Sequence, residues 1–484
     1  MVKGMVQGFD GIIPRMVRTP AQPGRQKIKI LFDIFPIILL DVVQGKKSFQ
    51  EKGFRSAPPE SGPCRRTAPG PGRRGGRTLV EPCHYRMDPP GSGSGSPMHL
   101  QKTAQEYLRS LFPAIAALFL VLVLLLCSCS REKDPIPIGL AINLSGDGGP
   151  AAEHIRDGVR LGVETVNSRG GINGHPLELL VRDDRNDPED ILAVDQDLIN
   201  RGVPVIMGHS ISQNTLVAYP LVTGQNVLLF TAYTATSELS NRDDLFFRTS
   251  VDTSSYGRAM AGLFRDAGIE RVSALLDLDN ASFSEDYLNQ IRKNYNGTIH
   301  KVSFHARKEA DWNRIAARLL QGAPQAVVML ANYRQTAIVA QKLRQAGATI
   351  PFYATLWDQS PCLIHIGGSA VEGIRILTFI APEYDNDQYH EFTRLLGRRY
   401  LRHPTAKSMR GYEMVQILAR AMRSVPYPPS AAAIKKQLLS DTYPTLLGEV
   451  RFNSSGDVQR PLYVVTVRDG RFVQEQILEP AEQP

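Results

Sequence analysis

After residue 135, short β-branched runs alternate with amphipathic helical stretches, and this alternation limits the possible folds more than any other feature of the chain. Residues 136–144 (IPIGLAINL) predict a strand, residues 149–171 a helix that two glycines end, and residues 177–184 the next strand. A helix at 188–202 and a buried strand at 203–208 (VPVIMG) are expected to follow. The alternation resumes beyond residue 246, with strands expected at 271–277, 298–304, 326–331, 351–355 and 373–379. Strands that alternate with helices favour parallel sheets covered by helices on both faces.

The alternating part is too long for one simple hydrophobic core, so it predicts two doubly wound α/β lobes. Residues 385–445 are helical in pattern, and residues 448–478 return to strands. A strand element after long helices indicates that the chain crosses between the lobes more than once. In open sheets of this kind, ligands collect at the carboxyl ends of the strands.

A short apolar run precedes this part of the chain. Fourteen apolar residues extend from Ala114 to Cys127, with Lys102 and Arg109 just upstream. This pattern is typical of a secretory signal, and the run is short for a membrane-spanning helix. The sequence LCSC that follows resembles a bacterial lipobox, in which Cys129 after the small Ser128 would be lipidated. Cys127 does not fit because leucine is too large for the position before the cut.

A signal of this kind works at a chain start, which Met98 would provide. Residues 1–97 are basic and rich in glycine and proline, which predicts a disordered segment or an over-extended start. The expected organisation is therefore a leader at 1–97, a lipoprotein signal peptide at 98–128 and a lipid-anchored tether at 129–133.

Charge and cysteine usage exclude several functions. Residues 1–97 hold sixteen lysines and arginines against seven acids, so residues 98–484 carry 40 against 41 and lack a net basic charge. This argues against a nucleic-acid partner, which needs a basic face. Beyond the signal, only Cys129 and Cys362 remain. A lipidated Cys129 would leave Cys362 unpaired, so neither a disulfide nor a cysteine-based zinc site is expected.

From residue 136 to about 478 the chain resembles the type I periplasmic solute-binding proteins, in the branched-chain amino-acid-binding branch of the ABC importers. The resemblance rests on VNSRGGINGHPLELLVRDDRNDPED, on VIMGHSISQNTLVAYPL and on VVMLANYRQTAIVAQKLRQAG. It implies two Rossmann-like lobes, joined by three crossovers, that close around one small solute like a Venus flytrap. Lobe 1 would hold residues 134–251 and 381–456, and lobe 2 residues 252–380 and 457–478. The resemblance implies no enzyme activity, cofactor or metal.

The resemblance also implies ligand-binding residues in the first lobe. Ser212 matches a serine that holds the ligand carboxylate, and a hydroxyl at a helix N-terminus suits that task, although a plain N-cap is the alternative. The next family position is a threonine, and here Ala235 occupies it between Thr234 and Thr236. Either neighbouring hydroxyl could serve, or the backbone N–H of Ala235 could act alone.

In the second lobe, Phe283 matches an aromatic that stacks on the ligand, and Tyr333 matches a tyrosine near the solute. Core packing is the alternative for both. An acid for the ligand ammonium is expected after residues 351–355, where the chain offers Trp357 and Asp358. An inward Asp358 would favour an α-amino acid, and an inward Trp357 an aromatic or aliphatic acid or an amide. The sequence leaves both open.

Two functions follow as expectations. The first is an exported, membrane-anchored lipoprotein that binds an amino acid or similar small carboxylate and delivers it to an ABC permease in the inner membrane. The second is an envelope lipoprotein that reuses the fold to regulate a cell-wall enzyme or sensor, with no transported ligand. Neither the choice of membrane nor the exact ligand follows from the sequence.

The leader prediction is testable by truncation. Deleting residues 1–97 should leave export and lipidation unchanged, because the signal needs only its own cationic, apolar and cysteine segments. Cys129→Ala should abolish lipidation, and the matched Cys127→Ala should not. Mass spectrometry of the mature protein checks this, and finding residues 1–97 on it would contradict the prediction.

Overall fold

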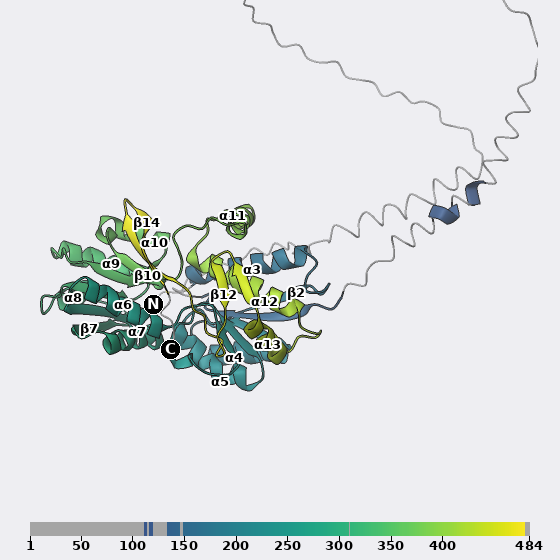
Figure 1. Ribbon diagram of the computed structural model, residues 1–484, viewed down its shortest axis with the longest axis horizontal. Helices are drawn as coiled ribbons and strands as arrows, with labels where there is room; N and C mark the ends of the chain where they lie inside the picture. Colours follow the sequence, from purple (N-terminus) through teal and green to yellow (C-terminus); the bar gives the residue numbers. More distant parts are fainter. Residues whose placement is uncertain (1–110, 114–115, 120–132, 146–148, 309, 480–484) are drawn as a thin grey trace, which may run out of the picture. The chain divides into compact units, whose positions relative to one another are not determined.

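The computed structural model describes residues 111–113, 116–119, 133–145, 149–308 and 310–479 (Figure 1). The leader at 1–97, the lipidation site Cys129 and most of the signal at 98–128 lie outside the described residues, so these expectations stay predictions. Within the described ranges, no helix has the length and apolar character needed to cross a membrane.

The first sheet has five parallel strands in the order β2-β1-β3-β4-β5. Its strands are β1 (Ile136–Ile142), β2 (Leu177–Asp183), β3 (Val205–Gly208), β4 (Leu228–Thr231) and β5 (Phe246–Arg248). The helices that connect them are α3 (Gly149–Ser168), α4 (Pro188–Asn200) and α5 (Ser212–Gly224), and the short η2 (Ser237–Leu239) precedes β5. The strands before residue 209 were predicted, whereas β4, with four residues, and β5, with three, were not.

The second sheet has seven strands in the order β14-β13-β10-β9-β8-β6-β7. Its parallel strands are β6 (Arg271–Asp277), β7 (Thr298–Phe304), β8 (Ala326–Leu330), β9 (Phe352–Thr355) and β10 (Arg375–Thr378). The antiparallel hairpin of β13 (Leu462–Arg468) and β14 (Arg471–Leu478) extends one edge. Asp469 and Gly470, with φ of 52° and 69°, form its turn, as expected for an Asp-Gly hairpin.

Helices accompany the second sheet along the chain. They are α6 (Thr253–Asp266), α7 (Ala281–Asn294), α8 (Trp312–Leu319), α9 (Tyr333–Gln345) and α10 (Pro361–Gly367), with η3 (Leu278–Asn280), η4 (Leu356–Asp358) and η5 (Gly368–Val371). Figure 1 shows these elements gathered on one side of the folded part and the elements of the first sheet on the other. The predicted architecture of two doubly wound α/β lobes is confirmed.

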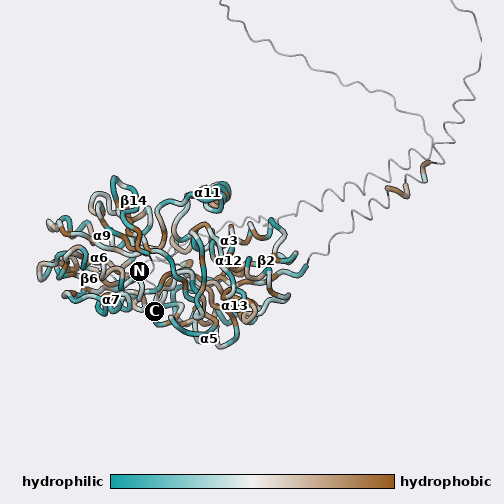
Figure 2. The backbone as a smooth tube through the Cα atoms, viewed as in Figure 1, coloured by the Kyte–Doolittle hydropathy of each residue, from teal (hydrophilic) through white to brown (hydrophobic). Residues whose placement is uncertain are grey.

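The segment between the second sheet and its hairpin returns to the first lobe. It contains α11 (Asp387–Tyr400), α12 (Ala406–Arg423), α13 (Ala431–Ser440) and the two-stranded sheet of β11 (Thr442–Thr445) and β12 (Gly448–Arg451). One hydrophobic core joins residues of α12 and α13 to β1, β3 and β4. The chain therefore passes between the sheets after β5, after β10 and after β12, in agreement with the three expected crossovers. In Figure 2 hydrophobic segments of the backbone, in brown, lie mainly inside the folded part, and hydrophilic segments, in teal, lie mainly at its edge.

Two glycines let α3 and α12 pack in very close contact. A Cβ on Gly158 would lie 2.1 Å from the backbone oxygen of Ser408, and one on Gly162 would lie 2.7 Å from the Val415 Cβ. The two glycines are four residues apart, so they share one face of α3. The close approach fixes where the first turn of α12 lies.

Gly158→Ala should therefore lower the free energy of unfolding by about 1–3 kcal/mol, because the added methyl meets backbone that cannot rotate away. Gly397→Ala is the matched control, since that helical glycine has no atom within 4 Å of an added Cβ. It should be neutral or stabilising by up to about 1 kcal/mol. Guanidinium unfolding followed by circular dichroism measures both, and equal effects would contradict the packing account.

Candidate functional site

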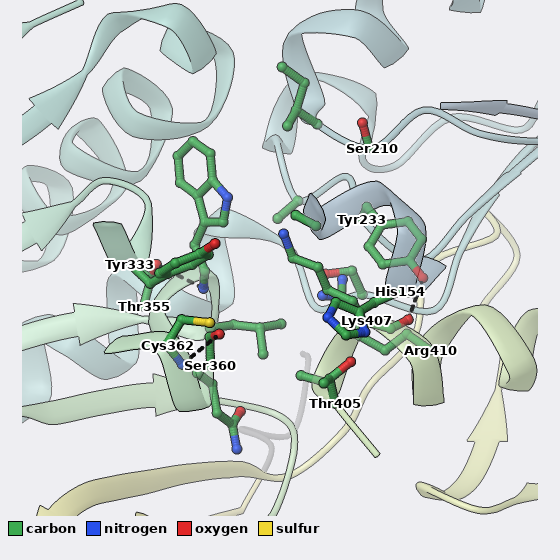
Figure 3. Close-up of a pocket in the computed structure, with 18 of the residues that line it drawn as sticks. His154, Ser210, Tyr233, Tyr333, Thr355, Ser360, Cys362, Thr405, Lys407 and Arg410 are labelled. Atoms are coloured by element: carbon green, nitrogen blue, oxygen red, sulfur yellow. Dashed lines mark hydrogen bonds between the residues drawn. The ribbon is translucent and has the colours of Figure 1, made fainter. Parts of the chain in front are cut away.

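A cavity of about 430 Å³ lies at the carboxyl ends of both sheets. Ser210, Tyr233 and Ser250 reach it from the segments that follow β3, β4 and β5, and Tyr333 and Trp357 reach it from those that follow β8 and β9. Figure 3 shows Tyr333, Thr355, Ser360 and Cys362 on one side and Ser210, Tyr233, His154, Lys407 and Arg410 on the other. The site thus has walls from both lobes, as ligand sites of open α/β sheets do.

Aromatic rings form much of the cavity wall. Phe283 packs edge-to-face against Trp357 and against Tyr287, with 5.6 Å between ring centroids in each pair. Tyr256 stacks on Tyr287 at 5.8 Å. Tyr233 and Tyr333 complete this aromatic set. Such a wall favours a ligand with an apolar body, and aromatic rings prefer these edge and offset geometries.

Four of the eight predicted ligand-binding residues line the cavity. They are Ala235, Phe283, Tyr333 and Trp357. Phe283 lines the cavity and also belongs to the hydrophobic core, whereas Tyr333 and Trp357 are half-buried. Their contact with a ligand stays a prediction.

The structure places Ser212 differently from the expectation, outside the cavity lining. Ser212 is 1% exposed, and its hydroxyl accepts hydrogen bonds from the backbone N–H groups of Ala235, at 3.1 Å, and Thr236, at 3.4 Å. The hydroxyl therefore ties the loop after β4 to the start of α5. Ser210, two residues earlier, lines the cavity instead.

Thr234 and Thr236 are also buried outside the lining. The Thr234 hydroxyl bonds the hydroxyl of Thr215 at 2.5 Å. The Thr236 hydroxyl donates to Asp286 at 3.3 Å and accepts from the Glu238 N–H as the cap of η2. Both hydroxyls have local partners, which is why neither turns toward the cavity.

Asp358 lies fully buried behind the cavity wall that Trp357 forms. Its Oδ2 accepts from the Thr355 N–H at 3.1 Å and from the Thr355 hydroxyl at 3.4 Å, so the carboxyl caps η4. Burial raises its pKa to about 7, partly offset by hydrogen bonds from Thr336 and Thr355. Of the two residues left open by the sequence, Trp357 faces the cavity and Asp358 does not.

Charged residues at the cavity come mainly from α3 and α12, and sequence reasoning missed them. Glu153 pairs with Arg402 at 3.0 Å, and Arg402 also pairs with Asp157 at 2.7 Å. Burial, followed by the charges of Arg402 and Lys407, lowers the pKa of His154, which favours its neutral form. Lys407 and Arg410 form no ion pair in the described part of the chain. Their spacing after the helix cap Thr405 was the available sequence signal.

A second, more polar cavity of about 370 Å³ adjoins the first and shares Ser210, Asn280, Tyr333, Trp357 and Lys407 with it. Amide side chains add to its wall, among them those of Asn143, Asn332 and Gln335. Across the described residues, no group of three or more histidine, cysteine or acidic side chains could hold a metal ion.

A buried ionic triad supports the loop that carries Ser210. The His209 imidazole is fully buried, with Nδ1 2.6 Å from Asp184 Oδ2 and Nε2 3.2 Å from Asp195 Oδ2. Burial alone would lower its pKa, but the Asp195 charge and hydrogen bonds to both carboxylates outweigh burial and raise the pKa to about 10. His209 is thus an imidazolium that anchors the end of β3 to α4.

The family model of the periplasmic binding proteins matches residues 135–471. The chain belongs to this family. Among curated proteins it is similar to the leucine-, isoleucine-, valine-, threonine- and alanine-binding protein of Pseudomonas aeruginosa. The two are 23% identical over 319 residues, 64% of this chain and 84% of that protein.

Solved structures of periplasmic binding proteins share the fold. A leucine-binding protein from Thermotoga maritima has a TM-score of 0.65 at 20% identity, over 71% of this chain and 99% of its own. A solute-binding protein of an ABC transporter from R. palustris, in complex with benzoate, has a TM-score of 0.65 at 16% identity. The match covers 72% of this chain and 97% of that protein. These likenesses establish the type I periplasmic binding fold.

The His209 triad makes stability depend on pH. Because the folded pKa of about 10 exceeds the ordinary 6.5, its contribution to stability is complete below about pH 6.5 and is lost as pH rises through 10. At pH 8.5 we expect nitrogen-resolved NMR of the histidine rings to show protons on both Nδ1 and Nε2 of His209. A His209 ring with a single N–H at pH 8.5 would contradict this account.

Proposed function

We propose that this periplasmic binding protein is the extracytoplasmic solute-binding subunit of an ABC importer, and that its solute is a small carboxylate with an aromatic or branched apolar body. The observation that carries the proposal is the wall of the cavity: Trp357 faces the space between the lobes and Asp358 is buried behind it. An α-amino acid is the less favoured ligand.

The charge of the wall supports this choice. A buried ammonium without a carboxylate partner costs several kcal/mol. Among the described lining residues, Glu153 is the only carboxylate, and Arg402 already pairs with it at 3.0 Å. An α-amino acid in this cavity would therefore lack a free acid for its ammonium, because Asp277 and Asp279 line only the adjoining polar cavity. A simple carboxylic acid requires none.

The relatives cover both ligand classes. The Pseudomonas aeruginosa relative is named for binding leucine, isoleucine, valine, threonine and alanine, whereas the R. palustris protein was solved with benzoate. A benzoate-like acid suits the aromatic wall of this chain, which includes Phe283, Tyr333 and Trp357.

Delivery to a permease follows from the two-lobed design. Walls from both lobes surround the solute in the closed form, so a permease can distinguish loaded from empty protein by lobe closure. The expected lipid anchor at Cys129 would hold the protein at the membrane on its extracytoplasmic side. A regulator without a transported ligand is less favoured, because the cavity has an organised aromatic wall and charged groups.

Ligand binding should stabilise the full chain, purified in detergent. At about a hundredfold excess over its dissociation constant, benzoate or a related aromatic acid should raise the free energy of unfolding by roughly 2.7 kcal/mol. Leucine at the same concentration should stabilise it less. Thermal unfolding followed by intrinsic fluorescence checks this. No shift with a broad panel of organic acids, amino acids and amides, together with pull-down of a cell-wall enzyme, would favour the regulator.

Side-chain substitutions separate the two ligand classes. Trp357→Leu should weaken binding of an aromatic acid by about 1–3 kcal/mol through lost ring contact, and Asp358→Asn should leave it nearly unchanged. Trp312→Phe, at a tryptophan that packs on Phe304 away from the cavity, is the matched control. Isothermal titration calorimetry measures all three. Loss of binding in Asp358→Asn with a normal Trp357→Leu would reverse the assignment in favour of an amino acid.

A further inference from the structure

An unpaired buried cation lies at one side of the cavity. Arg410 is 6% exposed, and within the described residues its guanidinium makes no hydrogen bond or ion pair, with Nε among the buried atoms that have no partner. Its contacts are aromatic: the guanidinium carbon lies 4.6 Å from the ring centre of Tyr233 and 5.3 Å from that of Phe379. Aromatic faces attract a cation but do not satisfy its N–H groups.

The surroundings of Arg410 do not balance its charge. A second guanidinium group, that of Arg460, lies 5.0 Å from the centre of the same Phe379 ring. The fully buried Glu413 pairs with Arg460 at 2.7 Å and also accepts from the Thr445 hydroxyl at 2.6 Å. One carboxylate thus serves two buried arginines. The charges of Arg410, Arg460 and Glu413 sum to +1, and no other carboxylate in the described part of the chain forms an ion pair with either arginine.

Lys407 adds a second cation to the same wall. It precedes Arg410 by three residues, so both lie on one face of the first turns of α12. Lys407 also makes no ion pair or side-chain hydrogen bond within the described ranges, and it lines both cavities. Burial, followed by the Arg410 charge, lowers its pKa to about 8. Figure 3 shows Lys407 and Arg410 across the cavity from Tyr333 and Cys362.

We propose that Lys407 and Arg410 form the anion-binding site of the cavity and hold the carboxylate of the bound solute. This inference rests on the proposed function and identifies the residues that select the charge of the ligand. The N-terminus of α12 contributes in the same direction, because its backbone dipole favours an anion there. The aromatic body of the solute would then extend toward Phe283 and Trp357.

The proposal has an unusual consequence for the ligand-free protein. A buried cation without a partner destabilises the fold, and an apolar side chain of similar size removes that penalty. Arg410→Met should therefore maintain or raise the melting temperature of the ligand-free chain while impairing carboxylate binding. If Arg410 instead stabilises the fold through its contacts with Tyr233 and Phe379, Arg410→Met should lower the melting temperature of the ligand-free chain.

The experiment uses the full chain in detergent with Trp312→Phe as background, which leaves Trp357 as the only tryptophan of the chain. Fluorescence titrations compare benzoate with benzamide, which has the same ring and no charge. In the background protein, benzoate should bind at least tenfold more tightly than benzamide. Arg410→Met and Lys407→Met should each lower the affinity for benzoate by roughly 10–100-fold, as expected for loss of a charge-assisted hydrogen bond. The affinity for benzamide should stay within about twofold of the background value.

Two further variants make the result specific. Arg410→Lys should restore part of the benzoate preference, because it restores the charge. Arg420 lies on the same helix but pairs with Asp441 outside the cavity. Arg420→Met should therefore change the affinities for both ligands and the melting temperature only slightly. If Arg410→Met keeps the preference for benzoate and lowers the melting temperature of the ligand-free chain, the anion-site proposal is overturned. The proposed function, binding of a small carboxylate, would then still hold. If no carboxylate binds the background protein at all, both proposals fail.

Discussion

The close packing of α12 on α3 is the contact on which the site depends. Gly158 leaves room for the backbone of Ser408, so the first turn of α12 lies directly against α3. That turn carries Lys407 and Arg410, and α3 carries Glu153 and His154 on the same cavity. Because α12 follows the second sheet in the sequence and packs in the first lobe, the site is complete only after the chain has crossed between the lobes twice. A shift of α12 by a few tenths of an ångström would move both cations.

The charged groups in and around the cavity divide into those that hold the fold and those left for a ligand. Asp184 and Asp195 are bonded to His209, Glu153 to Arg402 and Glu413 to Arg460. Each of these acids has a basic partner inside the protein, where an unpaired charge is costly, although Asp195 and Glu413 each keep one oxygen without a hydrogen bond. Lys407 and Arg410 remain without an acid in the described chain. A ligand carboxylate would complete the cluster, which links affinity for an anion to reduced stability of the empty protein.

Most of the fold could be predicted from the sequence, and about half of the expected site residues reach the cavity. The alternation of apolar runs with helical patterns predicted both sheets. The strands β4 and β5 are too short to show a periodic pattern of apolar residues. The family resemblance pointed to Phe283, Tyr333 and Trp357, and all three line the cavity. It could not tell which hydroxyl or carboxyl would find a local partner: Ser212 bonds the loop after β4, and Asp358 caps its own turn. Arg410 was missed because its role depends on the absence of a nearby acid, which only tertiary structure reveals.

A crystal structure of the chain with a bound aromatic carboxylate tests the central claim most directly. The account predicts carboxylate oxygens within hydrogen-bond distance of Lys407 Nζ and the Arg410 guanidinium, with the ring against Phe283 and Trp357. It also predicts that Asp358 keeps its bond to Thr355. A ligand whose carboxylate is held at Ser212 and the backbone of Ala235, with Lys407 and Arg410 turned away from it, would contradict the account.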